Sequence, residues 1–248
     1  MALLLFLPRF LLVSVWIALS LLSVMVVFPF VSPRVRAWMN QRWSRLLMFI
    51  CGVRMDVQGD PRLDGPVMWV ANHVSWVDIF VLNCVRPTAF VAKSEIRDWP
   101  IIGWLVAGAG TVFIERGRRH AVQTVGTQME ARFMHGEAVG LFPEGTTSPG
   151  EDVRPFHSSL FEAAIHVGVD IQPVALRFYH RGRRSDYVAF VGEQNLVQNL
   201  WRLLGTTGVC VELVFLTVLP GEECRGAGRA RVASHAHRLV RHAVVAKP

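Results

Sequence analysis

Charged side chains are scarce in this sequence. They make up 18% of its 248 residues, whereas hydrophobic residues make up 52%. About a quarter of the residues in a typical soluble domain are charged, so this balance predicts a membrane segment in addition to a folded domain. The length allows one good-sized hydrophobic core beside such a segment.

The signatures of several enzyme classes are absent. No G-x-S-x-G stretch occurs, which argues against a hydrolase with a serine nucleophile on a strand–helix turn. Neither G-x-x-x-x-G-K-[ST] nor G-x-G-x-x-G occurs, which disfavours nucleotide-dependent kinases and dehydrogenases. The cysteines have no C-x-x-C spacing, so we expect reduced packing residues; they are Cys51, Cys84, Cys210 and Cys224.

The longest run without a formal charge lies near the N-terminus. It covers the 24 residues between Arg9 and Arg34, and a helix of about 20 residues crosses the hydrocarbon core of a bilayer. The run is longer than the hydrophobic region of a signal peptide, and no A-x-A-like cleavage site follows it. We therefore expect an uncleaved anchor with a hydrophobic helix over residues 10–32.

A second helix is predicted over residues 36–52, where Trp38 and Trp43 stand among arginines. This pattern suits a helix that lies in the membrane interface, and it suits a first helix of the soluble domain equally well. The anchor, residues 1–55, is thus one hydrophobic helix or a helical hairpin. More arginines follow the apolar run than precede it. The positive-inside rule therefore places residues 56–248 in the cytoplasm.

The net charge is +7, from 26 basic and 19 acidic residues. A nucleic-acid-binding protein can have this composition. The basic residues are nevertheless spread in short groups, such as RGRR at 116–119 and at 181–184. Attraction to anionic membrane lipid and to acidic substrates explains them more simply, so we expect membrane lipid and no nucleic acid as a partner.

From about residue 64, short apolar runs alternate with longer mixed segments. The expected strands are Val67–Ala71, Thr88–Val91, Thr111–Ile114, Ala138–Phe142, Ile171–Phe178, Tyr187–Val191 and Val209–Leu216. The expected helices are Val77–Val85, Arg119–His135, Ser159–Val167 and Gly228–Val245. This alternation predicts one α/β domain with a mostly parallel central sheet flanked by helices. Ligands of such sheets bind at the carboxyl ends of the strands.

Polar residues follow three of the expected strands. His73 comes directly after the first, and Asp78 can face it if His73 lies in a loop and Asp78 in the first helical turn. Ser75 with Asp78 has the spacing of a capping box, which would create that break. A neutral imidazole accepts a proton from a hydroxyl, and a carboxylate orients the ring; the alternative is that Asp78 only caps the helix.

Two further strand ends carry groups suited to an anion. Arg116 follows the strand 111–114, where a guanidinium can bind a phosphate with two hydrogen bonds. After the strand 138–142, Pro143, Glu144 and Gly145 have the pattern of a tight turn. The hydroxyls of Thr146 and the next two residues, with neighbouring amides, can hold an anion there.

These stretches resemble the glycerolipid acyltransferase family. NHVSWVD has its NH-x4-D pattern, and GTVFIER, FPEGTTS and the proline-containing IQPVAL are similar to its later blocks. VAKSEIRDWPIIGWL (91–105) agrees as well, and the likeness to bacterial 1-acylglycerol-3-phosphate acyltransferases covers roughly residues 60–220. All four blocks occur in the family's order.

The resemblance implies a reaction and its residues. His73 would be the general base oriented by Asp78, without an acyl-enzyme intermediate. Arg116 with Glu144, Gly145, Thr146 and Lys93 would hold the glycerol-phosphate end of the lysolipid. Pro173 would lie toward the acyl chain or its donor.

Further expectations follow from the same family. The acceptor would be the sn-2 hydroxyl of lysophosphatidic acid and the co-substrate acyl-CoA or acyl-carrier protein, with no cofactor and no metal. The enzyme would sit on the cytoplasmic face of the bacterial inner membrane. One departure concerns the acceptor: His157 stands where many members have a lysine. The same chemistry on another lysolipid, such as lyso-ornithine lipid, and a non-catalytic protein that binds anionic lipid are the alternatives.

Overall fold

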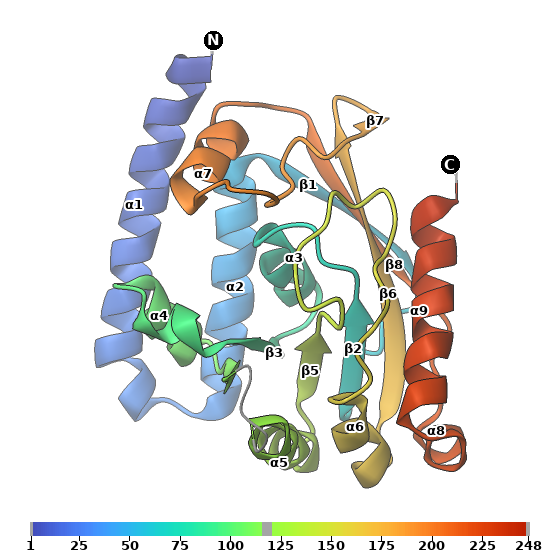
Figure 1. The fold of residues 1–248 in the computed structure, drawn as a ribbon. Helices are drawn as coiled ribbons and strands as arrows, with labels where there is room; N and C mark the ends of the chain where they lie inside the picture. The colour runs from blue at the N-terminus through green and yellow to red at the C-terminus, as the bar shows by residue number, and fades with distance from the viewer. Residues whose placement is uncertain (1, 116–120, 247–248) are drawn as a thin grey trace.

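The structure, a computed structural model, describes residues 2–115 and 121–246. Within them an eight-stranded sheet has the order β1-β8-β6-β2-β5-β3-β4, and β7 pairs with β6 (Figure 1). Strand β6 runs antiparallel to β8 and β7, and the other ladders are parallel. The prediction of an α/β fold with a mostly parallel sheet flanked by helices is confirmed.

The strands are β1 Val53–Gly59, β2 Val67–Ala71, β3 Thr88–Lys93, β4 Val112–Ile114, β5 Ala138–Leu141, β6 Asp170–His180, β7 Arg183–Arg184 and β8 Val209–Phe215. The α-helices are α1 Ala2–Val26, α2 Pro33–Cys51, α3 Val77–Val85, α4 Ile102–Gly108, α5 Ala121–Met134, α6 Phe161–Val167, α7 Leu196–Leu204, α8 Gly221–Ala227 and α9 Arg229–Val245. Short 3-10 helices are η1 Phe28–Phe30 and η2 Ser94–Asp98.

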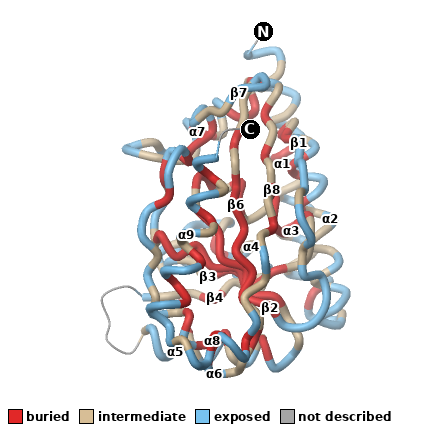
Figure 2. The backbone as a smooth tube through the Cα atoms, turned by 90° about the vertical axis from the view of Figure 1, so that its right-hand side faces the viewer, coloured by how far each residue is buried: buried red, intermediate tan, exposed pale blue. Residues whose placement is uncertain are grey.

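Two helical layers cover the sheet, and its central strands are buried between them (Figure 2). Residues of β2 alternate between two cores because successive side chains of a strand point to opposite faces. Trp69 packs in the core that α2, α3 and α7 share, whereas Met68 and Val70 pack in the core of α5, α6 and α8. The burial of both faces explains why β2 is an uninterrupted apolar run.

The N-terminal helix differs in extent from the predicted helix over 10–32. It begins at Ala2, includes Arg9 and ends at Val26, and α2 begins at Pro33 rather than 36. Ser32 accepts a hydrogen bond from the Val35 N–H, and a proline at the first helical position favours a new start there. The stretch Ala2–Phe30 is apolar and long enough to cross a membrane, and 11% of its most apolar part is buried.

Helix α1 packs along the rest of the chain instead of standing apart from it (Figure 1). Phe6 contacts α7, Trp16 donates a hydrogen bond to the carbonyl of Trp43 in α2 (3.2 Å), and Val24 lies against Gly108 of α4. Arg9 donates to the carbonyl of Leu204 at 3.2 Å and to that of Thr206, at the end of α7. The charge in α1 thus binds the carbonyls that this helix end leaves unpaired.

Some predicted elements were wrong or missed. The expected strand Tyr187–Val191 is a turn and loop, in which the Ala189 N–H bonds the Asp186 carbonyl. Strand β1 was missed because it lies at the sheet edge with mostly exposed side chains and no apolar run. Helices α4, α7 and α8 were missed as well; each has seven to nine residues, too short to show a clear period.

Candidate functional site

The site lies where β2 and β5 end side by side. The two strands are parallel, and Val70 pairs with Leu141. His73 and Glu144 each follow three residues beyond that pair, so the register brings them to the same level. The His73 N–H donates to Glu144 Oε1 at 2.7 Å. Two strand ends that the sequence suggested separately are thereby one site.

His73 and Asp78 form a hydrogen-bonded pair. His73 Nδ1 lies 2.7 Å from Asp78 Oδ2, and the same oxygen accepts the backbone N–H groups of Val74 (2.7 Å) and Ser75 (2.9 Å). Asp78 is fully buried, whereas the His73 side chain is 20% exposed. The carboxylate therefore requires a hydrogen on Nδ1, and this tautomer leaves the Nε2 lone pair free to accept a proton.

The capping-box expectation is half correct. Asp78 accepts the Ser75 N–H, as the acidic member of a capping box does, but Ser75 Oγ has no bond to the helix. The N-cap residue of α3 is Trp76 rather than Ser75, and the helix begins at Val77 as expected. The backbone donors are held by Asp78 alone, so it caps the helix start and orients His73 through one oxygen.

Glu144 and Ser148 hold the backbone of His73 from both sides. Glu144 Oε2 accepts the N–H of Arg154 (2.9 Å) while Oε1 accepts that of His73, and the Ser148 N–H donates to the His73 carbonyl (2.7 Å). Glu144 is 4% exposed, and this burial raises the pKa of its carboxyl above the usual range. Both oxygens are thus occupied by the protein itself, which makes Glu144 a positioning group for His73.

The His73 ring rests on a column of aromatic rings. It stacks on Phe142 with a centroid distance of 4.1 Å and an interplanar angle of 14°, and Phe142 stacks on Phe90 at 5.5 Å. Gly140 makes room for this column, because an added Cβ would lie 2.3 Å from the Phe90 ring. Strands β3 and β5 therefore set the plane of the imidazole.

Asn72, the residue after β2, continues the pairing with β6 through its side-chain amide. Its Nδ2 donates to the Leu176 carbonyl (3.0 Å), and its Oδ1 accepts the Leu176 N–H (2.7 Å). The amide imitates the next rung of the β2·β6 ladder while the backbone turns into the His73 loop. This role of Asn72 was not predicted from the sequence, although an asparagine directly before the histidine, at a strand end, was the available signal.

Of the remaining predicted residues, Gly145 and Thr146 follow β5, and Lys93 is the last residue of β3. The Gly145 N–H bonds the Phe142 carbonyl at 3.1 Å, as the predicted turn requires, and φ of Gly145 is 70°. Thr146 is exposed beside this turn, and Lys93 is exposed at the end of β3. Arg116 lies outside the described residues.

Pro173 lies inside the sheet rather than at its edge. It is buried in β6 and pairs with Val70 of β2. Its neighbour Gln172 accepts the indole N–H of Trp69 (3.1 Å) and donates to the carbonyl of Asp60 (2.7 Å). The surroundings of Pro173 are those of a packed strand.

Other titratable groups of the described residues include carboxylates, histidines and four cysteines. In the ranges 2–115 and 121–246, no group of three or more His, Cys, Asp or Glu side chains is arranged to hold a metal ion. The four cysteines are free, and burial raises the pKa of Cys51 and of Cys84 to about 12. These thiols are poor nucleophiles because the thiolate is the reactive form.

Comparison with known proteins gives consistent matches. A family profile described as Acyltransferase matches residues 54–177. Lyso-ornithine lipid O-acyltransferase of Pseudomonas aeruginosa is 38% identical over 179 residues, 72% of this chain and 68% of that protein. The 1-acyl-sn-glycerol-3-phosphate acyltransferase of Neisseria gonorrhoeae is 36% identical over 168 residues, 66% of each chain.

A solved structure matches over nearly the whole length. The 1-acyl-sn-glycerophosphate acyltransferase PlsC from Thermotoga maritima superposes with a TM-score of 0.71 at 21% identity, covering 98% of this chain and 94% of that one. At this identity the match shows the fold. The aligned regions of the two sequence relatives span about two thirds of those proteins.

Proposed function

The chain belongs to the acyltransferase family, and we propose that it transfers a fatty acyl group from a thioester to the free hydroxyl of a lysolipid. The observation that carries the proposal is the His73–Asp78 pair, 2.7 Å apart at the end of β2. The exposed part of the imidazole can meet a hydroxyl, and the buried carboxylate stabilises the imidazolium that forms.

The proposed step is a direct transfer of the acyl group from the thioester to the hydroxyl. The lysolipid hydroxyl oxygen bonds to the thioester carbonyl carbon while His73 Nε2 takes the hydroxyl proton. The tetrahedral intermediate then expels the thiolate, which takes the proton from the imidazolium and leaves as a thiol. No side chain forms a bond to the acyl group. The donor in this proposal is acyl-CoA or acyl-carrier protein.

Lyso-ornithine lipid is the acceptor that we propose first. The relative with that activity in its name is 38% identical over 72% of the chain, against 36% over 66% for the lysophosphatidate enzyme. The exposed His157, where many family members have a lysine, removes a permanent positive charge from this side of the site. This order reverses the expectation from the motifs, and lysophosphatidate becomes the second candidate.

The acceptor-binding residues separate the two candidates. In the proposal Arg116, Lys93 and the turn at Gly145 and Thr146 bind the head group. If the group is a phosphate, Arg116→Ala raises the KM for lysophosphatidate and leaves kcat nearly unchanged, because a guanidinium binds a phosphate with two hydrogen bonds. An unchanged KM would remove Arg116 from the phosphate site.

Membrane attachment is part of the proposal. Helix α1 is apolar and mostly exposed, which is consistent with membrane association. We propose the bacterial inner membrane, with the catalytic site on the cytoplasmic side. Salt extraction of membranes tests this attachment, because screening weakens ionic contacts but not apolar burial: the protein stays bound, and its release would contradict an apolar anchor.

One experiment tests the acceptor and the reaction together. The purified protein is given lyso-ornithine lipid, lysophosphatidate and lysophosphatidylcholine, each with acyl-CoA and with acyl-carrier protein, and the products are weighed by mass spectrometry. We expect diacyl ornithine lipid as the main product and a loss of about 10²- to 10⁴-fold in kcat for His73→Ala. A His73→Ala variant as active as the parent would favour a non-catalytic lipid-binding protein instead.

A further inference from the structure

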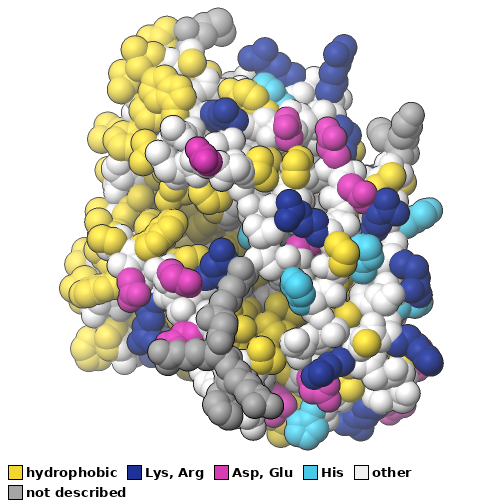
Figure 3. Space-filling view, viewed as in Figure 1, with side chains coloured by type: hydrophobic (Ala, Val, Ile, Leu, Met, Phe, Trp, Pro, Cys, Tyr) yellow, Lys and Arg dark blue, Asp and Glu magenta, His cyan; other side chains and the backbone are white. Residues whose placement is uncertain are grey.

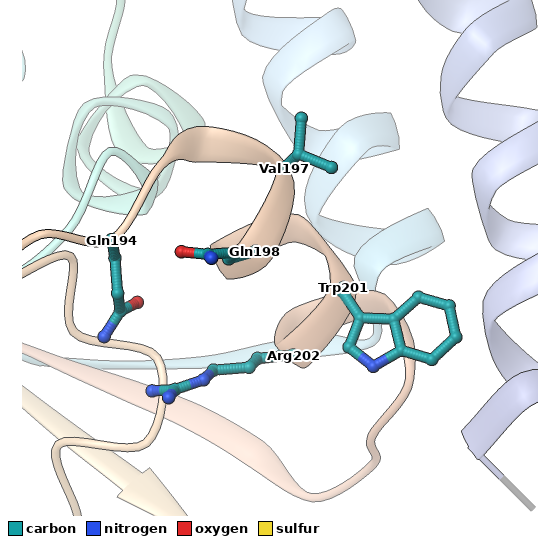
Figure 4. Close-up of a pocket in the computed structure, with 5 residues that line it drawn as sticks. All are labelled: Gln194, Val197, Gln198, Trp201 and Arg202. Atoms are coloured by element: carbon teal, nitrogen blue, oxygen red, sulfur yellow. The ribbon is translucent and has the colours of Figure 1, made fainter.

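The outer face of α7 is an exposed surface that the proposed reaction does not use. Val197 is 74% exposed and Trp201, one helical turn later, is 44% exposed. A shallow pocket lies over this face, lined by Gln194, Val197, Gln198, Trp201 and Arg202 (Figure 4). Trp201 points toward α1, while Arg202 and the two glutamines extend on the other side.

This face continues into the apolar surface of α1. Trp201 contacts Phe6 with ring centroids 4.3 Å apart. Next to Phe6, α1 presents a row of exposed side chains: Leu3, Leu4, Leu7, Phe10 and Leu11, each at least 48% exposed. Figure 3 shows hydrophobic side chains gathered over α1, whereas charged ones cover the opposite side. A continuous apolar surface of this kind on two helices requires a partner that is itself apolar.

The inner face of α7 contacts the loop of residues 72–76, which carries His73 and is called the catalytic loop below. Asn199 is fully buried, and its Oδ1 accepts the indole N–H of Trp76 at 2.9 Å. Trp76 lies between His73 and Asp78 in the chain and directly precedes α3. Asn199 Nδ2 also donates to the carbonyl of Ala189 (3.1 Å), in a loop that bonds the catalytic loop again, through the Phe190 N–H and the Val74 carbonyl (2.9 Å).

We propose that the outer face of α7 docks on the lipid bilayer beside α1, and that Asn199 transmits the position of the docked helix to the loop that carries His73 and Asp78. In the docked state Val197 lies in the acyl boundary, Trp201 at headgroup depth and Arg202 against lipid phosphates. An amphipathic helix with this distribution lies in the plane of the interface. The inference goes beyond the proposed function, because docking does not depend on which lysolipid reacts.

The docking is tested with a fluorophore at Val197→Cys and, as a matched control, at Met134→Cys. Met134 is 77% exposed and apolar but belongs to α5, away from α1. Each labelled protein is reconstituted in phosphatidylcholine–phosphatidylglycerol vesicles with brominated or ordinary acyl chains. Unsubstituted protein, treated in the same way, reports labelling of the native cysteines.

We expect brominated chains to quench the label at 197 at least about twofold more than the label at 134, because an interfacial helix lies roughly 5–10 Å below the headgroup surface. Equal quenching at the two positions would overturn the docking. So would a change at 197 that follows protein concentration rather than lipid, since that would assign the surface to a second copy of the chain. These readouts need no transfer activity, so their failure is separate from failure of the proposed function.

The link to the catalytic loop is tested with Trp76→Phe. This change removes the indole N–H and keeps a ring against Phe80. Trp16→Phe is the matched control, because Trp16 also donates its indole N–H and also contacts Phe80 edge-on. We expect Trp76→Phe to lower kcat about tenfold with little change in KM, since small misplacements of reacting groups are costly. Equal kcat values for the two variants, with equal Tm, would refute the link.

Discussion

Asp78→Asn removes the charge of the buried carboxylate and keeps its shape. In the native site one oxygen, Oδ2, accepts three hydrogen bonds, and the other, Oδ1, has no partner among the described residues. The asparagine oxygen can take the place of Oδ2. The reversed amide would aim its NH₂ at the N–H groups of Val74 and Ser75, so these two donors hold the asparagine in the orientation that preserves the His73 tautomer.

The size of the expected decrease in kcat follows from the interactions that Asp78→Asn retains. The hydrogen bond to His73 survives but is no longer charge-assisted, and such bonds contribute roughly 1–2 kcal/mol more than neutral ones. The imidazolium that forms during transfer also loses an adjacent negative charge. Together we expect a loss of about 1.5–3 kcal/mol in transition-state stabilisation, which is a decrease in kcat of roughly 10- to 150-fold. KM changes little, because Asp78 is buried away from the acceptor.

The assay is the rate of thiol release from acyl-CoA or acyl-carrier protein at saturating lysolipid, measured for the parent, Asp78→Asn, Asp78→Ala and His73→Ala. Asp78→Ala leaves the N–H groups of Val74 and Ser75 unpaired in a buried site, which costs about 1–3 kcal/mol each. We therefore expect a lower Tm for Asp78→Ala than for Asp78→Asn. The Tm of Asp78→Asn should remain near that of the parent.

Two results would refute this reasoning. If Asp78→Asn keeps the parent kcat, the charge of Asp78 plays no part in the reaction and its role is to cap α3. If it falls as far as His73→Ala, the backbone donors do not preserve the ring orientation. Either outcome would contradict the geometry in which Asp78 acts through a single oxygen.

Three further variants test the positioning of His73 and the contact between α1 and α7. For Glu144→Gln we expect kcat to fall about tenfold, because the amide oxygen can replace only one of the two carboxylate oxygens that accept backbone N–H groups. Burial raises the pKa of Glu144 from 4.5, so the difference in Tm between the parent and this variant should decline as the pH rises from 4.5 through the raised pKa. A constant difference in Tm from pH 4.5 to 8 would contradict this expectation. Gly140→Ala places a methyl group 2.3 Å from Phe90, so we expect a loss of about 1–3 kcal/mol in the free energy of unfolding and a lower kcat, whereas an unchanged kcat would show that the aromatic column does not orient His73. Arg9→Met leaves the carbonyls at the end of α7 unpaired, which should lower the free energy of unfolding by about 1–2 kcal/mol, and an unchanged denaturant midpoint would exclude this role.

Local patterns were sufficient for much of the fold. Helix α3 was predicted at its observed bounds and β2 likewise, because an apolar strand that turns into an apolar helix leaves a clear change of period. Strand β1 and the loop at 187–191 were not predicted correctly, because the available pairing partners, rather than local preference, decide whether half-exposed segments become strands. Helix α1 could be predicted as apolar, but its packing against α2, α4 and α7 depends on contacts between distant residues.

The role of Glu144 shows the limit for the site. The family resemblance implied that Glu144 binds substrate, and nothing local indicates that both of its oxygens face backbone N–H groups of His73 and Arg154. The role of Asn199 is even harder to predict, because this residue lies 123 residues along the chain from Trp76, to which it is hydrogen-bonded. Neither residue has a spacing that marks its partner.

By itself the sequence determined the local features on which the proposal depends: a histidine and an aspartate five residues apart at a strand end, and an apolar N-terminal helix. These are local properties, set by residue type and by the period of the side chains. The tertiary structure alone decided how His73 is held, through Glu144, Ser148 and Phe142. The physical reason is that the register of parallel strands and the packing of helices join segments far apart in the chain, and no short-range pattern encodes such distances.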